Sequence, residues 1–157
     1  MVPEKVQKVF RDHGLEAIEF EPGSTHTVEL AAARHGVEPA RIAKSLLFRN
    51  KAEAYTLVVC PGDKRIPSGT LKRVLGSKVS MADAGETERV TGYRPGGVCP
   101  FALEGVEILL DRELGRYETI FPAAGTDATS VRTTLEALAR ITGGRVVDFV
   151  DAAGAPL

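Results

Sequence analysis

A glycine pair held between two prolines interrupts the middle of this chain and constrains how the sequence around it can fold. In the segment TGYRPGGVCPFAL, Gly96 and Gly97 lie between Pro95 and Pro100. Glycine enters positive φ freely and allows close approach to the backbone, whereas proline fixes φ and removes an N–H donor. The segment therefore predicts a tight turn feeding a strand. A turn whose N–H groups bind an anion or a developing oxyanion is the alternative interpretation.

Short helical and strand-like patterns alternate on both sides of this turn. Helices are predicted over residues 3–13, 28–35, 39–43, 69–75, 84–90 and 135–142. Strands are predicted over residues 15–20, 45–49, 54–60, 106–110, 118–123 and 145–150, the second and third forming a hairpin. The expected helix N-caps are Thr27, Ser68, Asp83 and Thr133. This mixture of hairpins and crossovers indicates an α/β fold with a mixed, curved sheet.

Length and composition indicate one domain over residues 1–157. Hydrophobic residues make up 43% of the chain and charged residues 26%, which is typical of a globular protein. No apolar run approaches the ~20 residues of a membrane helix, and the first residues predict an amphipathic helix rather than a signal peptide. Cys60 and Cys99 form no CxxC pattern. We expect both to be buried in a reducing compartment, the cytoplasm, with no metal and no cofactor.

Charge is distributed unevenly along the chain. Residues 41–78 carry nine Lys or Arg against two acids, a net charge of +7, whereas the whole chain carries −1. Such a segment is typical of a protein that binds a polyanion, and the alternative interpretation is a set of solvated charges scattered over the surface. The absence of a compact basic run argues against a duplex DNA binder.

Four segments, taken in order, resemble the YbaK/ProX family of free-standing aminoacyl-tRNA deacylases. They are residues 25–49, 61–76, 91–101 and 109–132. The family is similar to the editing domain inserted in bacterial prolyl-tRNA synthetases, and the resemblance extends from about residue 18 to residue 148. It implies a central mixed sheet, partly closed like a barrel, with helices packed around it.

The resemblance gives Lys44 the leading role. The segment IAKSL matches a family motif whose lysine is functionally essential, which implies that Lys44 contacts a phosphate, the ribose or the acyl carbonyl. Taken alone, a lysine between apolar neighbours is usually a snorkelling surface residue. Ser45, next in the motif, would point to the opposite side of a regular strand, so both residues can act only if the strand start is twisted.

The glycine turn matches the family's Gly-x-x-x-Pro loop, which implies that Gly96, Gly97 and Pro100 line the acyl pocket. The resemblance also aligns Gly125 and Ser130 with the family's second glycine loop and the pocket residue after it. Thr27 occupies a further pocket position, and Phe20 is a looser match to a pocket tyrosine. Some family members have a carboxylate or histidine where Ser130 stands and an aromatic residue where Thr27 stands, so the amino-acid specificity is left open. The proposed tRNA contacts are Lys64, Arg65, Lys72 and Arg73.

Conventional catalytic groups are not recognisable in the sequence. There is no G-x-S-x-G motif, and the three histidines form no triad pattern. His13 and His35 fall at predicted helix C-termini, where a positive charge is favoured for structural reasons. His26 precedes a helix cap and is a weaker candidate ligand contact. Asp111 and Asp127 have the turn roles usual for aspartate.

These observations predict a trans-editing hydrolase that removes a wrong amino acid from tRNA. The partner would be Cys- or Ala-tRNA(Pro), with Ser as a further candidate, and a prolyl-tRNA synthetase is a possible docking partner. The ester is already activated, so substrate-assisted cleavage with backbone oxyanion stabilisation suffices. The alternatives are a non-catalytic tRNA- or nucleotide-binding protein that retains the fold and, less favoured, a small-molecule-sensing regulator.

Overall fold

The computed structural model describes all residues, 1–157, as an α/β fold with five α-helices around mixed sheets. The α-helices are α1 (Glu4–His13), α2 (Val28–His35), α3 (Ser68–Leu75), α4 (Ala84–Thr91) and α5 (Leu135–Thr142). Two 3₁₀ turns are η1 (Pro39–Arg41) and η2 (Arg112–Arg116). The strands are β1 (Ala17–Glu19), β2 (Ile42–Asn50), β3 (Tyr55–Pro61), β4 (Val79–Met81), β5 (Val106–Asp111), β6 (Phe121–Pro122), β7 (Thr129–Val131) and β8 (Arg145–Val147).

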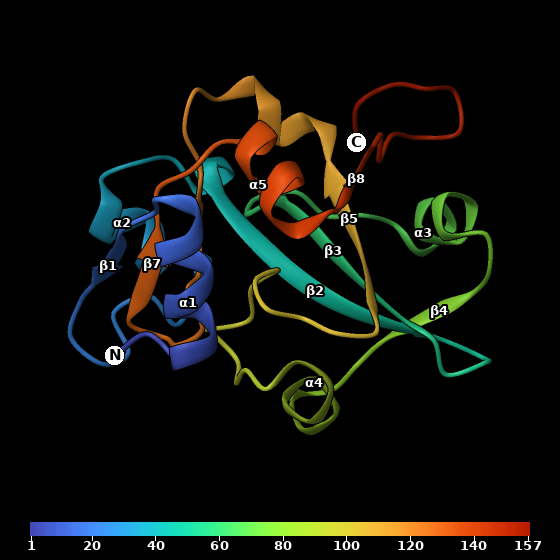
Figure 1. Cartoon of the computed structure of the whole chain (residues 1–157). Coiled ribbons are helices and arrows are strands. Elements are labelled where there is room, and N and C mark those ends of the chain that lie inside the picture. The colour runs from blue at the N-terminus through green and yellow to red at the C-terminus, as the bar shows by residue number, and fades with distance from the viewer.

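The long strand β2 is the centre of the larger sheet (Figure 1). The strand order is β4-β2-β3-β5-β8, with β6 also paired to β2. β2 runs antiparallel to β3 and β4, whereas β5 is parallel to β3 and β8 is parallel to β5. The predicted mixed sheet is therefore confirmed. It remains open at β4 and β8 rather than closing into a barrel.

A second, two-stranded sheet joins the beginning of the chain to its later part. β1 pairs antiparallel with β7, and an isolated bridge between Ala123 and Ser130 connects β7 to the segment after β6. Because β6 pairs with the start of β2 at Ile42 and Ala43, these contacts bring β7 close to the start of β2. This arrangement creates the wall of the cavity described below.

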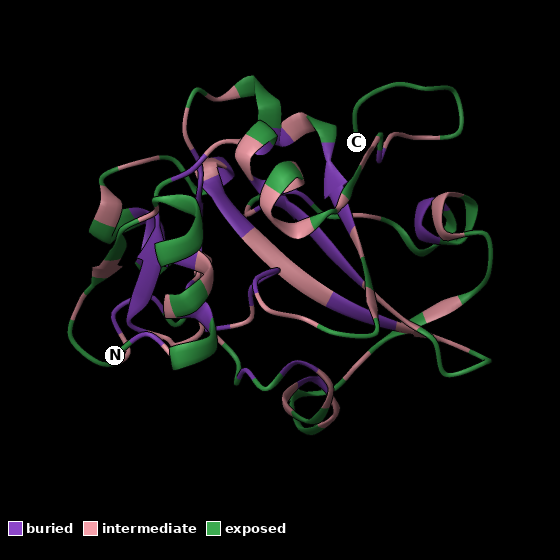
Figure 2. Cartoon of the chain, viewed as in Figure 1, coloured by how far each residue is buried: buried purple, intermediate pink, exposed green.

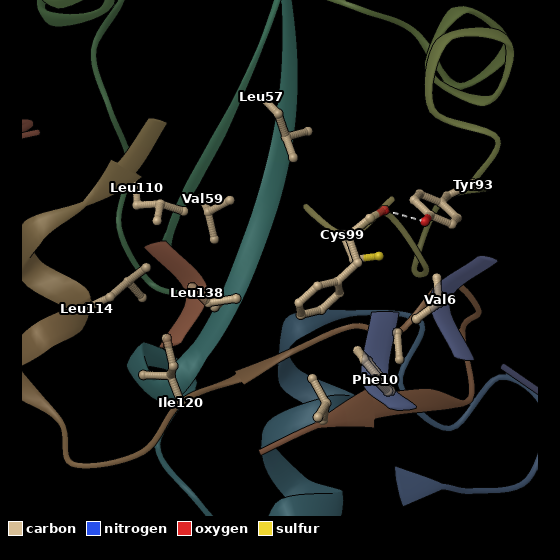
Figure 3. Close-up of a cluster of buried hydrophobic side chains, with 14 of the residues drawn as sticks. Val6, Phe10, Leu57, Val59, Tyr93, Cys99, Leu110, Leu114, Ile120 and Leu138 are labelled. Atoms are coloured by element: carbon tan, nitrogen blue, oxygen red, sulfur yellow. Dashed lines mark hydrogen bonds between the residues drawn. The ribbon is translucent and has the colours of Figure 1, made fainter. Parts of the chain in front are cut away.

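The two faces of the β2–β3 hairpin bury two separate cores. Leu57 and Val59 face the larger core with Val6 and Phe10 of α1 and Leu138 of α5 (Figure 3). The alternate residues of β3 face a smaller core with α3 and the chain end near Phe149. Strand alternation thus distributes helices over both faces of the sheet. The buried segments follow β2, β3 and β5 through the molecule (Figure 2).

The loop containing the glycine pair is folded into the larger core. The buried Tyr93 hydroxyl donates a hydrogen bond to the carbonyl oxygen of Phe101 at 2.5 Å, which closes the loop (Figure 3). The predicted tight turn is present, with the Gly97 N–H donating to the carbonyl oxygen of Arg94 at 2.9 Å. The strand expected directly after it is absent, because the chain continues as loop until β5 begins at Val106. Cys60 and Cys99 are buried free thiols, as predicted.

Two of the four predicted helix caps are correct. The Thr27 hydroxyl accepts the N–H of Leu30 at 3.2 Å, and the Asp83 carboxylate accepts the N–H of Glu86 at 2.8 Å. The Ser68 prediction is wrong because Pro67, already extended, occupies the N-cap position and Ser68 is the first helical residue.

The Thr133 cap prediction is also wrong, by one residue. The backbone of Thr133 exchanges two hydrogen bonds with Ile120, which keeps Thr133 extended, so Thr134 caps α5 instead. The short strands β4 and β7 were not predicted, because three residues carry too little alternation to be recognised. The predicted helix 39–43 ends at Arg41, where β2 begins.

None of the helices is both long enough and apolar enough to cross a membrane.

Candidate active site

A cavity of about 310 Å³ lies beside β2, where α2 and α4 begin and the glycine loop passes. Its 22 lining residues come from eight parts of the chain: the segment before α2, α2 itself, β2, β4 and the residue after it, α4, the glycine loop, β6 and the residue after it, and β7. Twelve of them are hydrophobic. Ligand pockets typically measure ~300–1,000 Å³, so this cavity accommodates one small group rather than a long one.

Six of the lining residues carry hydroxyl groups, namely Thr25, Thr27, Ser45, Thr87, Thr129 and Ser130. The Oγ atoms of Thr25 and Ser45 are buried and have no hydrogen-bond partner. Ser130, only 3% exposed, lies on β7 and pairs with His35. An unpaired buried hydroxyl costs about 1–3 kcal/mol, and native folds keep few of them. The unpaired hydroxyls of Thr25 and Ser45 are therefore candidate partners for a polar ligand, and Thr133, outside the cavity, carries a third unpaired hydroxyl.

His35 is turned inward from the last turn of α2 towards Ser130. Its Nε2 lies 2.7 Å from the Ser130 Oγ, and its ring stacks on Phe121 with 4.2 Å between centroids. Phe20 packs edge-on against the other side of this cluster, 5.2 Å from the His35 ring. Burial lowers the pKa of His35 below its usual value. The predicted positive charge at the helix end is therefore disfavoured at this residue.

His26 lies at the exposed rim of the cavity. Its Nδ1 is 3.6 Å from the carboxylate of Asp127, and both side chains remain partly exposed. Asp127 also accepts the N–H of Gly23 through its carboxylate and that of Thr25 through its carbonyl oxygen. Asp127 therefore ties the segment before α2 to the loop before β7.

Lys44 lies on β2 at the edge of this cavity, but its ammonium is bound elsewhere. In register, Lys44 pairs with Cys60 of the smaller core, whereas Ser45 pairs with Val59 of the larger core. The Lys44 Nζ donates to the carbonyl oxygen of Lys64 at 2.6 Å. β2 is regular here, so Lys44 and Ser45 point to opposite faces, as the sequence indicated. Two of the three ammonium donors of Lys44 have no acceptor in the protein.

Lys64 is part of a buried ion cluster. Its Nζ lies 2.7 Å from Asp111 and 2.9 Å from Glu113, and its side chain is 6% exposed. Burial lowers the pKa of Lys64, but hydrogen bonds to the two carboxylates outweigh this effect and raise it overall. The expected tRNA contact at Lys64 is incompatible with this position, because the ammonium is enclosed by acids. Asp111 has the predicted turn role, because its carboxylate accepts the N–H of Glu113 at 3.0 Å, and it is also the buried acid of the cluster.

Comparisons with known proteins agree on one family. The model of the aminoacyl-tRNA editing domain matches residues 22–141. The chain belongs to the aminoacyl-tRNA editing domain family. Its class of activity is aminoacyl-tRNA deacylation, and its class of partner is aminoacyl-tRNA.

Individual relatives extend over most of the chain. YwhH, an uncharacterized protein of Bacillus subtilis, is 38% identical over 132 residues, covering 83% of each chain. EbsC of Enterococcus faecalis, a candidate Cys-tRNA(Pro)/Cys-tRNA(Cys) deacylase, is 27% identical over 78% of this chain and 76% of its own. A crystal structure of a candidate trans-editing enzyme for prolyl-tRNA synthetase superimposes with a TM-score of 0.84 and 30% identity. That match covers 94% of this chain and 96% of the other.

Within the editing domain, the two glycines of the loop occupy different places. Gly96 lines the cavity with φ of +87°, and its N–H donates to no backbone carbonyl. Gly97 does not line the cavity, and its N–H is used within the turn. Val98, which sequence reasoning missed, lines the cavity with a second N–H that donates to no carbonyl. Gly96 and Val98 are therefore the candidate backbone donors of the glycine loop.

The other predicted pocket residues are divided in the same way. Thr27 and Ser130 line the cavity, whereas Phe20, Pro100 and Gly125 do not. Phe20 supports His35 from behind. A Cβ atom added at Gly97 would lie 2.7 Å from the Gly125 carbonyl oxygen. The two glycine loops thus pack backbone against backbone, and Gly125 acts through this packing.

The basic segment of the editing domain is largely paired internally. Five of its nine cations have partners within the protein: Arg41, Lys44, Arg49, Lys64 and Arg73. Arg49 and Lys64 are neutralised by acids outside the segment, so the +7 count overstates the exposed charge. The remaining four are Lys51, Arg65, Lys72 and Lys78. Of the predicted tRNA contacts, only Arg65 and Lys72 are exposed and unpaired.

Proposed function

We propose that this protein is a trans-editing hydrolase that removes a small, mischarged amino acid from tRNA(Pro). The observation that carries this proposal is the small cavity, which combines unpaired hydroxyls with free backbone N–H groups on an editing-domain scaffold. The candidate substrates are Cys-, Ala- and Ser-tRNA(Pro). The relatives named for Cys-tRNA(Pro) deacylation and for editing beside prolyl-tRNA synthetase support the choice of tRNA.

Cavity size supports a small amino acid. About 310 Å³ is close to the lower limit of ligand pockets, and 12 of the 22 lining residues are hydrophobic. A synthetase rejects a slightly smaller or near-isosteric amino acid by only about 10–200-fold, which is why a second hydrolytic site is needed. A cavity that admits only small residues performs this second selection by size.

In the proposed mechanism, water attacks the ester carbonyl carbon and the bond to the ribose oxygen breaks. The proton from water is transferred to that oxygen, which releases the free amino acid and a tRNA with a free terminal hydroxyl. The neighbouring 2′-hydroxyl assists the proton transfer and makes the reaction specific for RNA. The N–H groups of Gly96 and Val98 stabilise the oxyanion, a role that needs donors fixed before the reaction.

Lys44 supplies the positive charge in this mechanism. One of its donors is held by the Lys64 carbonyl oxygen on the face of β2 opposite Ser45, so the two remaining donors serve a phosphate oxygen of the tRNA at that face rather than the acyl carbonyl in the cavity. The Lys64 carbonyl limits the positions that the ammonium adopts. The Lys44 ammonium is a compact charge on a flexible side chain, and the planar guanidinium of an arginine at this position would not reproduce its contacts.

The test is a deacylation panel of Cys-, Ala-, Ser- and Pro-tRNA(Pro), with the wild type and Lys44→Ala. We expect the wild type to spare Pro-tRNA(Pro) and Lys44→Ala to lose at least ~100-fold in rate, as for other removed charge-stabilising donors. Lys44→Arg should also be slow, and Lys51→Ala, which changes an exposed lysine in the β2–β3 turn, is the matched control. Near-normal turnover by Lys44→Ala would contradict the proposed role of Lys44 in the mechanism. Binding of tRNA without turnover by the wild type would favour a non-catalytic binder.

A further inference from the structure

We propose that His35 is a positioning residue of the cavity, which fixes the Ser130 hydroxyl so that the site prefers serine over alanine. This inference rests on the proposed function and names the amino acid that the same site selects. The observations that carry it are the His35–Ser130 contact of 2.7 Å and the two unpartnered buried hydroxyls, Thr25 and Ser45, in the same cavity.

His35 is not needed to end α2. Gly36, in the left-handed conformation, donates its N–H to the carbonyls of Ala32 and Ala33 and closes the helix. The preceding residue, Arg34, is exposed and provides the cation that a helix C-terminus favours. The His35 ring is instead enclosed by Phe121 and Phe20. Two aromatic contacts and a short hydrogen bond together fix its orientation towards Ser130.

The contact with His35 fixes whether the Ser130 hydroxyl acts as a donor or as an acceptor of hydrogen bonds towards the cavity. A free hydroxyl both donates and accepts hydrogen bonds. If Nε2 accepts the Ser130 proton, only the lone pairs of the hydroxyl face a substrate. If Nε2 donates, the Ser130 proton is free for a substrate. In each tautomer Ser130 presents a fixed polarity, and a fixed group discriminates between ligands better than a rotating one.

The unpaired hydroxyls of Thr25 and Ser45 extend the same argument to the amino acid. These two oxygens are already buried and unpaired in the free protein, and an alanine side chain leaves them unpaired. A serine side chain can donate one hydrogen bond and accept others. A site with buried polar groups rejects an analogue that lacks the matching hydroxyl much more strongly than an apolar pocket rejects an extra methylene. We therefore expect kcat/KM for Ser-tRNA(Pro) to exceed that for Ala-tRNA(Pro) by at least ~10-fold.

The test compares kcat/KM for Ser- and Ala-tRNA(Pro) in the wild type, Ser130→Ala, His35→Leu and the double variant. Ser130→Ala and His35→Leu should each reduce the serine preference by at least ~5-fold. The double variant should lose no more of the serine preference than either single variant, because both single changes remove the same His35–Ser130 contact. His35→Gln keeps a hydrogen-bonding side chain and should restore part of the preference. His13→Gln, at the exposed end of α1, is the matched control.

Each outcome separates this inference from the proposed function. If the wild type deacylates no aminoacyl-tRNA, the proposed function fails. If it deacylates Ser- and Ala-tRNA(Pro) equally, or if His35→Leu leaves the ratio unchanged, the function stands and the inference is overturned. If Ser130→Ala slows both substrates by the same factor, the hydroxyls bind the α-ammonium that all amino acids share, which also overturns it. Folding of His35→Leu is checked by its circular dichroism, and His35→Gln keeps the test valid if that variant unfolds.

Discussion

Two polar clusters on opposite faces of the central sheet differ in how completely their hydrogen-bonding groups are satisfied. On the smaller-core face, the Lys64 ammonium lies between Asp111 and Glu113, and its carbonyl oxygen accepts the Lys44 ammonium. On the cavity side, the buried hydroxyls of Thr25 and Ser45 have no partner. A fold retains an unpaired buried group at a cost, so the second cluster indicates ligand binding while the first indicates structural support.

In the ion cluster, the ionised forms of Asp111 and Glu113 both depend on the ammonium of Lys64. Burial raises the pKa of Asp111, and the hydrogen bond from Lys64 opposes this rise. The pKa of Glu113 is lowered, chiefly by its hydrogen bond to Lys64. The two acids therefore depend on one ammonium. Removing it leaves a buried carboxylate without its counter-charge, which is among the most destabilising changes in a protein interior.

The largest effect expected from this comparison is on stability. Lys64→Met should lower the free energy of unfolding by about 3–5 kcal/mol, the usual cost of breaking a buried pair. Urea denaturation measures it, with Lys72→Met, an exposed lysine on α3, as the matched control. Ser45→Ala should cost little or stabilise the fold, because it removes an unpaired hydroxyl. A Lys64→Met loss no larger than that of Lys72→Met would show that the ion cluster contributes nothing to stability.

The glycine loop contains the same contrast over two adjacent positions. A Cβ atom at Gly97 would lie 2.6 Å from the Thr126 nitrogen and 2.7 Å from the Gly125 carbonyl oxygen, both backbone atoms. Gly97→Ala should therefore lower the free energy of unfolding by about 1–3 kcal/mol through overpacking. Its deacylation rate per folded molecule should change little. Thermal denaturation and activity, both normalised to folded protein, give the two measurements.

Gly96→Ala is the companion variant, because Gly96 lines the cavity. Its φ of +87° also makes a side chain costly, so some stability is lost as well. The distinguishing result is the deacylation rate per folded molecule, which should fall for Gly96→Ala and not for Gly97→Ala. Equal losses of activity for the two variants would contradict the division of the loop into a site glycine and a packing glycine.

The sequence was sufficient for features that depend on neighbouring residues. Thr27 and Asp83 were recognised as caps because a helix N-terminus is satisfied by a side chain within three residues. The hairpin of β2 and β3 follows from two apolar runs and a polar turn. Lys44 and Gly96 were located through the family resemblance, and both line the cavity.

Features that depend on distant residues were missed. Lys64 appeared to be a free surface cation because Asp111 and Glu113 approach it only after β5 pairs with β3. His35 appeared to be a helix-end residue because Ser130 is 95 positions away. No local pattern connects such pairs, since their contact is created by the sheet. The count of basic residues in segment 41–78 overstated the exposed charge for the same reason, because distant acids pair with Arg49 and Lys64.

Exposed cations provide a smaller test of which basic residues meet tRNA. Arg65→Glu and Lys72→Glu should raise KM for aminoacyl-tRNA with little change in kcat, because they remove binding common to substrate and transition state. Each should also reduce the slope of log affinity against log salt by about 0.7. Arg73→Glu should have a weaker effect, because Arg73 is held by the carbonyl oxygen of Asp151 at 3.1 Å. If all three variants had equal effects, or if none changed the salt slope, pairing within the protein would not distinguish the cations that contact tRNA from those that do not.

The smallest expected effect is the response of stability to mild acid, and it involves the cavity cluster. The pKa of His35 is lowered from 6.5 by burial, so below pH 6.5 the unfolded chain binds a proton that the folded chain does not. Stability therefore falls as the pH drops through this window towards the folded-state pKa. We expect the free energy of unfolding, measured in urea between about pH 7.5 and 5, to decrease by less than the Lys64→Met change. In the ion cluster, the raised pKa of Asp111 acts with the opposite sign, and the lowered pKa of Glu113, which acts with the same sign, lies below its ordinary value of 4.5 and thus below this pH window. His35→Gln should flatten the profile and His13→Gln should not. An unchanged slope in His35→Gln would show that the half-buried imidazole of His35 is not the titrating group.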